Sequence, residues 1–260
     1  MWMVLLAVPV AVAAILPTVA EASPAVPKAP VASSDAHHET LRYGMRSGSV
    51  KELQKRLAQL KYYPGSIDGQ FGLDTQEAVW AFQEAHGLPG ESYVSSAMWR
   101  DLQHPSAPPV LVPHGGADRI EISLARELLV LYKNDKPELI SHVSSGGGYY
   151  FCSPGGGCGT AVTPTGNFHT LSFLPGWVTV PLGYMYNPVF FIGTAYAIHG
   201  DIPVPLQPVS HGCVRIPMDI AAFFHTMVQV PGEPVDLDWL LGHLGKRSFG
   251  LLSYCCLACW

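Results

Sequence analysis

The sequence predicts a multidomain protein: a small module of three helices, then a mainly antiparallel β-sandwich or barrel with one packed helix. Its 260 residues are enough for two domains with cores of their own. Charged residues make up only 13% of the chain, and its 26 glycines and 23 prolines are typical of loop-rich β proteins. The period of the apolar residues also changes, from helical spacing before residue 105 to strand-like alternation after residue 118.

The chain begins with an almost wholly apolar segment that ends in Ala20-Glu21-Ala22, a small-x-small cleavage pattern. We interpret residues 1–22 as a secretory signal peptide, although no Lys or Arg precedes the apolar run. The alternative is an uncleaved membrane tether, but Pro9 and Pro17 would interrupt a spanning helix. Both interpretations place the rest of the chain outside the cytoplasm.

Two proline-rich segments separate the folded parts. Residues 23–39 are rich in Pro and Ala without helical or strand periodicity, and residues 105–118 form a second such linker. They bound a helical domain at 40–104 and a β domain at 119–237, and they leave residues 238–260 as an unassigned tail.

The helical domain is expected to contain three helices. Ser49 and Glu52 form a capping box, and apolar residues at helical spacing follow them. Asp74 and Glu77 repeat this capping pattern at a second helix, and residues 95–102 are expected to form a short third one. The apolar positions of these helices would form the core of the domain.

The β domain is expected to alternate strands and tight turns, with one helix near its end. We expect strands at residues 119–124, 128–132, 141–145, 166–171, 177–180, 195–198 and 234–237, and a helix at 219–228.

Charge and cysteine usage narrow the functional classes. The net charge is −5 and no cluster of Lys and Arg occurs, which argues against a nucleic-acid-binding surface. Cys152 and Cys158 flank a short glycine-rich loop that a disulfide would close, and export would permit that bond. Three further cysteines, Cys255, Cys256 and Cys259, lie in the tail. A zinc site there would need a fourth ligand, and none lies at a suitable spacing.

Cys213 is the candidate nucleophile. It lies in the segment Ser210-His211-Gly212-Cys213-Val214-Arg215, and its thiol needs a neighbouring imidazole to become a reactive thiolate. A single cysteine in an exported protein is usually half of a disulfide. Gly212, however, permits a tight turn, on which the amides of Gly212 and Cys213 would form an oxyanion hole.

His199 is the candidate general base, at the end of an apolar strand. The carbonyl of Gly200 would accept a proton from its ring, fix the tautomer and turn the other nitrogen toward Cys213. His211 is closer to Cys213 in sequence, and we assign it a secondary role in orientation and local electrostatics. A purely structural role is the alternative for either histidine.

The helical domain resembles the peptidoglycan-binding domain of cell-wall enzymes, and the resemblance implies binding to the wall. It is carried by Gly48, Leu53-Gln54, Leu57, Tyr62, Gly65, Ile67-Asp68-Gly69, Phe71-Gly72, Thr75, Ala78-Val79, Phe82-Gln83 and Gly87-Leu88.

The β domain resembles the catalytic domain of L,D-transpeptidases of the YkuD type. The segments Ile198-His199-Gly200 and 210–215 carry the resemblance, together with Glu127-Leu128-Leu129-Val130-Leu131-Tyr132, Val143-Ser144-Ser145-Gly146 and Thr163-Pro164-Thr165-Gly166. The resemblance implies a bacterial enzyme, secreted or held at the cell wall, that transfers a tetrapeptide stem of peptidoglycan from Cys213 to an amine acceptor. It implies no metal or organic cofactor. Peptidoglycan stem peptides and glycan would be its partners.

The same resemblance implies two substrate-binding residues. Arg215 would hold a substrate carboxylate or brace the turn that carries Cys213. Tyr186 would flank the site of the acyl donor, although an ordinary place in the β core is its alternative.

Three other functions stay open at this point. An exported cysteine peptidase or carboxypeptidase would use the same dyad, with water as the acceptor. A zinc amidase would use His199, His211 and His225, although no His-Glu-x-x-His motif occurs. A non-catalytic protein would rely on the wall-binding domain alone.

Overall fold

The computed structural model describes residues 39–113 and 115–238. The predicted signal peptide at 1–22, almost all of the first linker and the tail after residue 238 lie outside these residues. Within the described part of the chain, no helix is long and apolar enough to cross a membrane.

The N-terminal part is helical, as the sequence predicts. It consists of β1 (Leu41–Arg42), α1 (Gly48–Gln59), α2 (Leu73–Ala85), β2 (Tyr93–Val94) and α3 (Ser96–Gln103). The two short strands pair with each other in antiparallel fashion, which the sequence did not indicate.

The start of each of the first two helices differs from the prediction. The N-cap of α1 is Ser47, whose Oγ accepts a hydrogen bond from the amide of Val50 at 3.2 Å, so the capping box assigned to Ser49 and Glu52 is wrong. Gly72 is the N-cap of α2 and offers no side chain. Glu77, assigned to capping there, instead accepts a hydrogen bond from the amide of Val204 at 3.0 Å. In both places a turn residue outside the motif determines where the helix begins.

The core of the helical part continues into the β part. Val50, Leu53 and Leu57 of α1 are buried, as expected of the apolar face of this helix. They belong to one hydrophobic cluster with Val130 and Ile140 of the β part. The helical part therefore shares a core with the sheet that follows it.

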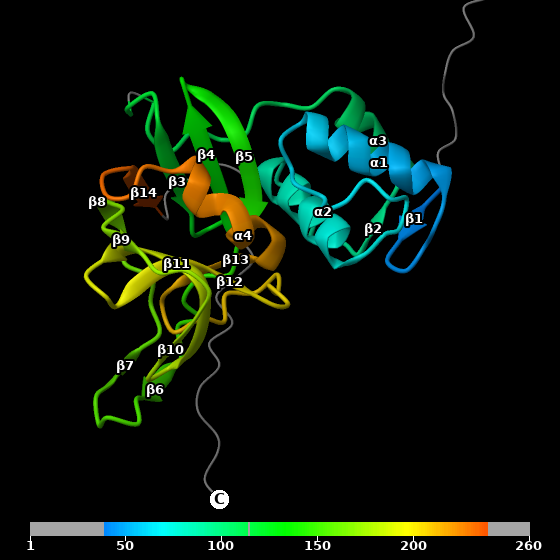
Figure 1. Cartoon of the computed structure of the whole chain (residues 1–260). Helices are drawn as coiled ribbons and strands as arrows, with labels where there is room; N and C mark the ends of the chain where they lie inside the picture. Colours follow the sequence, from blue (N-terminus) through cyan, green and yellow to red (C-terminus); the bar gives the residue numbers. More distant parts are fainter. Residues whose placement is uncertain (1–38, 114, 239–260) are drawn as a thin grey trace, which may run out of the picture. The chain divides into compact units, whose positions relative to one another are not determined.

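The β part is a sandwich of two sheets with one packed helix (Figure 1). The first sheet has the order β5-β4-β3-β14-β8, formed by β3 (Arg119–Ser123), β4 (Leu128–Lys133), β5 (Lys136–His142), β8 (Gly166–His169) and β14 (Pro234–Asp238). The second has the order β10-β11-β12-β13 with β9 on β11, formed by β9 (Ser172–Phe173), β10 (Trp177–Val180), β11 (Gly183–Ile192), β12 (Tyr196–Asp201) and β13 (Val214–Pro217).

Most strand pairs are antiparallel, but each sheet contains one parallel pair. In the second sheet, β12 lies parallel to β13, with Ile198 opposite Val214 and His199 opposite Arg215. Helix α4 (Met218–Met227), orange in Figure 1, follows β13 directly and packs against β12 and β13. Side chains from both sheets and from α4 form the inner core. The parallel pair brings two segments of the sequence motif onto neighbouring strands.

Several elements of the β part differ from the sequence prediction, and β9 and β13 are not among the expected strands. The longest strand, β11, was not predicted, because Asn187, with a φ of 47°, and Pro188 lie where its register with β12 shifts. The strand expected at 141–145 is β5, which ends at His142. A further hairpin consists of β6 (Tyr150–Cys152) and β7 (Cys158–Thr160).

Candidate active site

Cys213 and His199 line the same cavity, which has a volume of about 370 Å³. The β10–β11 hairpin supplies one wall, and the β6–β7 hairpin supplies residues to another. Its lining includes Phe151, Ser153, Val180, Leu182, Tyr184, Met185, Tyr196, His199, Ser210, His211, Cys213 and Arg215. The described residues contain one free cysteine, Cys213, and it opens into this cavity.

The turn before β13 requires glycine at position 212. Gly212 has a φ of +136°, and a Cβ there would lie 2.6 Å from Cε1 of Tyr196 and 2.8 Å from the carbonyl oxygen of Val162. A side chain would therefore meet both backbone strain and direct overlap. This glycine places Cys213 at the end of a tight turn, as the sequence predicts.

The oxyanion hole predicted from Gly212 and Cys213 is wrong in its first member. The amide of Gly212 donates a hydrogen bond to Oγ of Ser210 at 2.9 Å, and the Ser210 hydroxyl donates to the carbonyl of Cys213. An amide that already has an acceptor inside the turn is not poised for a substrate oxyanion. The amide of Cys213 remains as the candidate donor.

Residues 144–147 hold the turn from one side. Ser144 and Arg215 exchange two backbone hydrogen bonds of 3.0 Å, and the amide of Ser210 donates to the carbonyl of Ser145 at 2.9 Å. The Thr163 hydroxyl donates to the carbonyl of Gly212 and accepts from the amide of Gly146, both at 2.8 Å. These contacts explain why the segments around Ser144 and Thr163 belong to the motif.

Glu127 supports the same segment from beneath. Its buried carboxylate accepts hydrogen bonds of 2.6 Å from both the amide and the hydroxyl of Ser145. Burial raises the pKa of Glu127 to about 7, while the two hydrogen bonds from Ser145 oppose the rise. Sequence reasoning placed Glu127 in a hairpin motif but did not give its side chain a role.

His199 has the tautomer that a general base needs. Its buried ring contacts the carbonyl oxygen of Gly200 through Nδ1 at 3.0 Å. Because a carbonyl only accepts hydrogen bonds, Nδ1 carries the hydrogen, and Nε2 of the neutral ring is left to take a proton. Gly200 also allows close packing, since a Cβ there would lie 2.7 Å from Cβ of Ala221 in α4. The structure gives Gly200 the contact predicted for it.

Burial favours the neutral form of both candidate catalytic residues, Cys213 and His199. It raises the pKa of the Cys213 thiol, against the opposing effects of the Ala197 amide and the Arg215 charge. It also lowers the pKa of His199. The thiol contacts the carbonyl oxygen of Ala195 at 3.7 Å. A neutral thiol and a neutral imidazole suit a reaction in which the thiol proton is transferred during attack and not before it.

Arg215 lines the cavity and is braced within it. Its Nε lies 3.1 Å from Oδ2 of Asp201, and both side chains are partly exposed. The negative charge of Asp201 raises the pKa of His199, whereas that of Arg215 lowers it. Asp201 therefore affects both the proposed substrate contact and the base, and sequence reasoning did not single it out.

Tyr186 is not among the residues that line the cavity. The structure therefore does not support the place beside the acyl donor that was expected for it. Its ring packs 5.3 Å from that of Trp177, and its Cδ1 would lie 3.1 Å from a Cβ at Gly200. Tyr184 and Met185, at the end of the hairpin, line the cavity instead. Successive residues of a strand point to opposite faces, so Tyr186 packs against the inner core while Met185 belongs to the cluster on which Cys213 packs.

The histidines of the zinc alternative do not converge. His211 lines the cavity next to Cys213, but the ring of His225 stacks on Phe173 at 4.2 Å and does not line it. Over residues 39–113 and 115–238, no three His, Cys, Asp or Glu side chains are grouped to hold a metal ion.

Comparisons with known proteins find matches for both parts of the chain. Residues 117–237 match the L,D-transpeptidase catalytic domain family, and residues 46–102 match a family described as a putative peptidoglycan-binding domain. An L,D-transpeptidase from Xylanimonas cellulosilytica is 30% identical in sequence, with a TM-score of 0.72, over 77% of this chain and 98% of that one.

A curated relative matches a shorter stretch. The N-acetylmuramoyl-L-alanine amidase CwlM of Mycobacterium tuberculosis is 38% identical over 53 residues, which are 20% of this chain. The chain spans 13% of the length of that relative.

Proposed function

The chain belongs to the L,D-transpeptidase family, and we propose that it cross-links bacterial peptidoglycan through an acyl-enzyme on Cys213. One observation carries the proposal. A free thiol and a histidine of fixed tautomer open into a single cavity, on a fold shared with a known L,D-transpeptidase.

The first step would form a thioester. The sulfur of Cys213 attacks the carbonyl between the L- and D-centres of a tetrapeptide stem while Nε2 of His199 takes the thiol proton. The Cys213 amide would donate to the developing oxyanion. As the tetrahedral intermediate collapses, the C–N bond breaks and His199 returns the proton to the leaving amine of D-alanine.

The second step would transfer the acyl group. An amine of a neighbouring stem attacks the thioester, its proton passes to His199, and the C–S bond breaks as the thiol is restored. Water competes with the amine, so the cavity must limit its access. Val180, Leu182 and Met185 line the cavity wall with apolar side chains, and Met185 belongs to the small cluster on which Cys213 packs.

Charge would guide the stem into the cavity. Arg215 offers a fixed guanidinium at the cavity wall, and Asp201 holds it at Nε. The other nitrogens of the guanidinium suit a substrate carboxylate, since Arg binds carboxylates through a planar fork. His211, beside Cys213 in the lining, would contribute to orientation and electrostatics.

The helical part would hold the enzyme on the wall. Helices α1, α2 and α3 lie within or close to the matched peptidoglycan-binding family, and we propose that they act as a three-helix wall-binding module. We also propose that the enzyme is exported, with residues 1–22 as its signal peptide.

The test is product analysis with a purified disaccharide-tetrapeptide. We expect cross-linked dimers, released D-alanine and a thioester on the peptide that contains Cys213, seen by intact mass spectrometry. Cys213→Ser would give none of these. Tripeptide without dimers would instead assign a peptidase, and turnover without a Cys213 adduct would overturn the proposed mechanism.

A further inference from the structure

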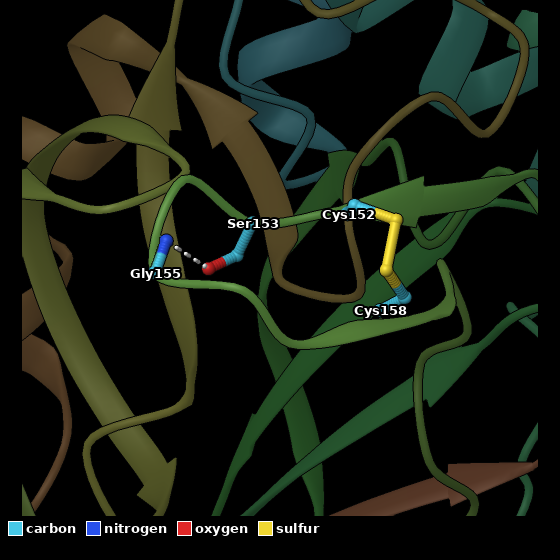
Figure 2. The surroundings of a disulfide bond; sticks show 4 residues. All are labelled: Cys152, Ser153, Gly155 and Cys158. Atoms are coloured by element: carbon cyan, nitrogen blue, oxygen red, sulfur yellow. Dashed lines mark hydrogen bonds between the residues drawn. A yellow bond between two sulfur atoms is a disulfide. The ribbon is translucent and has the colours of Figure 1, made fainter.

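The β6–β7 hairpin contributes to the cavity and is closed by a disulfide. Cys152 and Cys158 lie opposite each other in the ladder and are bonded, a pairing that the sequence permits (Figure 2). The loop between them is tightened by the amide of Gly155, which donates to Oγ of Ser153 at 3.1 Å. Two residues of the hairpin region, Phe151 and Ser153, line the cavity that contains Cys213.

The hairpin also holds His211. The Phe151 ring meets the His211 ring edge to face, with centroids 4.7 Å apart, and Tyr149 does the same at 5.5 Å. The Tyr149 hydroxyl donates to the carbonyl of Val209 at 3.2 Å. The side of the cavity next to the catalytic turn is therefore formed by this hairpin.

The disulfide is the main local constraint on the hairpin tip. Each strand has only three residues, and a hairpin of this size is marginal in water. Its base is anchored, because Tyr149 and Ala161 are joined by a backbone hydrogen bond of 2.8 Å. The tip carries a loop with three glycines, and the outward side chain of Tyr150 is 73% exposed. Little apolar burial is available to replace the covalent closure.

We propose that Phe151 is a substrate-positioning residue held in place by the Cys152–Cys158 disulfide, so that the enzyme needs this pair oxidised and Cys213 reduced. The proposal rests on the proposed transpeptidase function. Phe151 would form the wall against which the stem peptide lies, and it would keep His211 beside the turn. Loss of the disulfide would then weaken substrate binding without changing the chemistry of the thiol.

Reduction of the wild-type enzyme tests whether activity requires the Cys152–Cys158 disulfide. A water-soluble phosphine reduces the disulfide to two thiols, and the phosphine is oxidised to its oxide with oxygen taken from water. Unlike a thiol reductant, it adds no competing sulfur nucleophile to the thioester. Cys213 is already a thiol and is not changed.

The decisive comparison uses the wild type and the double variant Cys152→Ala/Cys158→Ala, each with and without phosphine. We expect KM for dimer formation to rise about tenfold in the double variant and in the reduced wild type. The rate of Cys213 alkylation by iodoacetamide should stay within about twofold in all four samples. Phosphine should have no effect on the double variant.

Variants of Phe151 test its role in positioning the substrate while the disulfide is intact. Phe151→Ala should raise KM about as much as loss of the disulfide, while Phe151→Tyr should retain the wild-type value because it keeps the ring. If circular dichroism shows that the double variant does not fold, the Phe151 variants still test whether Phe151 positions the substrate.

The inference would be overturned if the double variant or Phe151→Ala had the KM of the wild type. It would also be overturned if phosphine changed the KM of the double variant. A wild type that forms no dimers would refute the proposed function instead, so the two failures are distinguishable.

Discussion

Thr163→Val tests whether hydrogen bonding behind the catalytic turn sets its position. The substitution keeps the shape of the side chain and removes the hydroxyl that joins Gly146 and Gly212 through two bonds of 2.8 Å. Each bond contributes about 1 kcal/mol net, and a buried amide or carbonyl left unpaired costs about 1–3 kcal/mol in its place when no water replaces the hydroxyl. Because Thr163 is fully buried and two groups lose their partner, we expect a loss of about 2–6 kcal/mol in the free energy of unfolding.

The turn that carries Cys213 should also shift, since its Gly212 carbonyl loses its partner. A shift of this kind is expected to lower kcat for dimer formation by about 10- to 100-fold. Urea unfolding followed by tryptophan fluorescence measures the first effect, and steady-state kinetics with the tetrapeptide measures the second. Thr163→Ser is the matched control, because it keeps the hydroxyl and loses only a methyl group, at about 1 kcal/mol.

The reasoning would be refuted if Thr163→Val unfolded at the same urea concentration as the wild type and kept kcat within about twofold. Equal losses of kcat in Thr163→Val and Thr163→Ser would also contradict it, since packing rather than the hydroxyl would then position the turn.

Four further predictions concern Cys213, His199 and their charged neighbours. Cys213→Ser and His199→Ala should each lower kcat by about four orders of magnitude, as loss of a nucleophile or its base does, while the unfolding midpoint in urea stays close to that of the wild type. The acid limb of kcat/KM should have its midpoint below the ordinary pKa of histidine, because burial lowers the pKa of His199 and the base works only when neutral. Asp201→Asn should move that midpoint to still lower pH, because the Asp201 carboxylate raises the pKa of His199; a midpoint that rose would contradict this sign. Arg215→Lys should raise KM several-fold with a smaller change in kcat, measured with the same tetrapeptide, and an unchanged KM would remove Arg215 from substrate binding.

Much of the fold follows from local patterns. The alternation of Arg119–Ser123 predicts a strand with nearly the observed bounds, but all five of its residues are buried and not every second one. The one helix of the β part is shifted by a single residue at each end. Local patterns are less informative where the chain bends. Asn187 and Pro188 break the alternation of β11, so the longest strand was missed.

The site was also predicted in part. The contact between His199 and the Gly200 carbonyl follows from neighbouring residues, and the structure contains it. The roles of Thr163 and Glu127 could not be derived, because their partners lie 49 and 18 residues away in the chain. The position of Tyr186 depends on the register of β11 with its neighbours, which a single sequence does not define across a bulge.

The residue types alone determined which atoms are able to react here: a thiol on a glycine turn, an imidazole whose own strand supplies its hydrogen-bond acceptor, and a pair of cysteines close enough to bond. Tertiary structure decided which of these groups line one cavity. Three long-range arrangements did this: the parallel pairing of β12 with β13, the hydrogen bond from Thr163 to Gly212, and the place of Phe151 in the cavity lining. They depend on packing energies between distant segments, which no local pattern encodes.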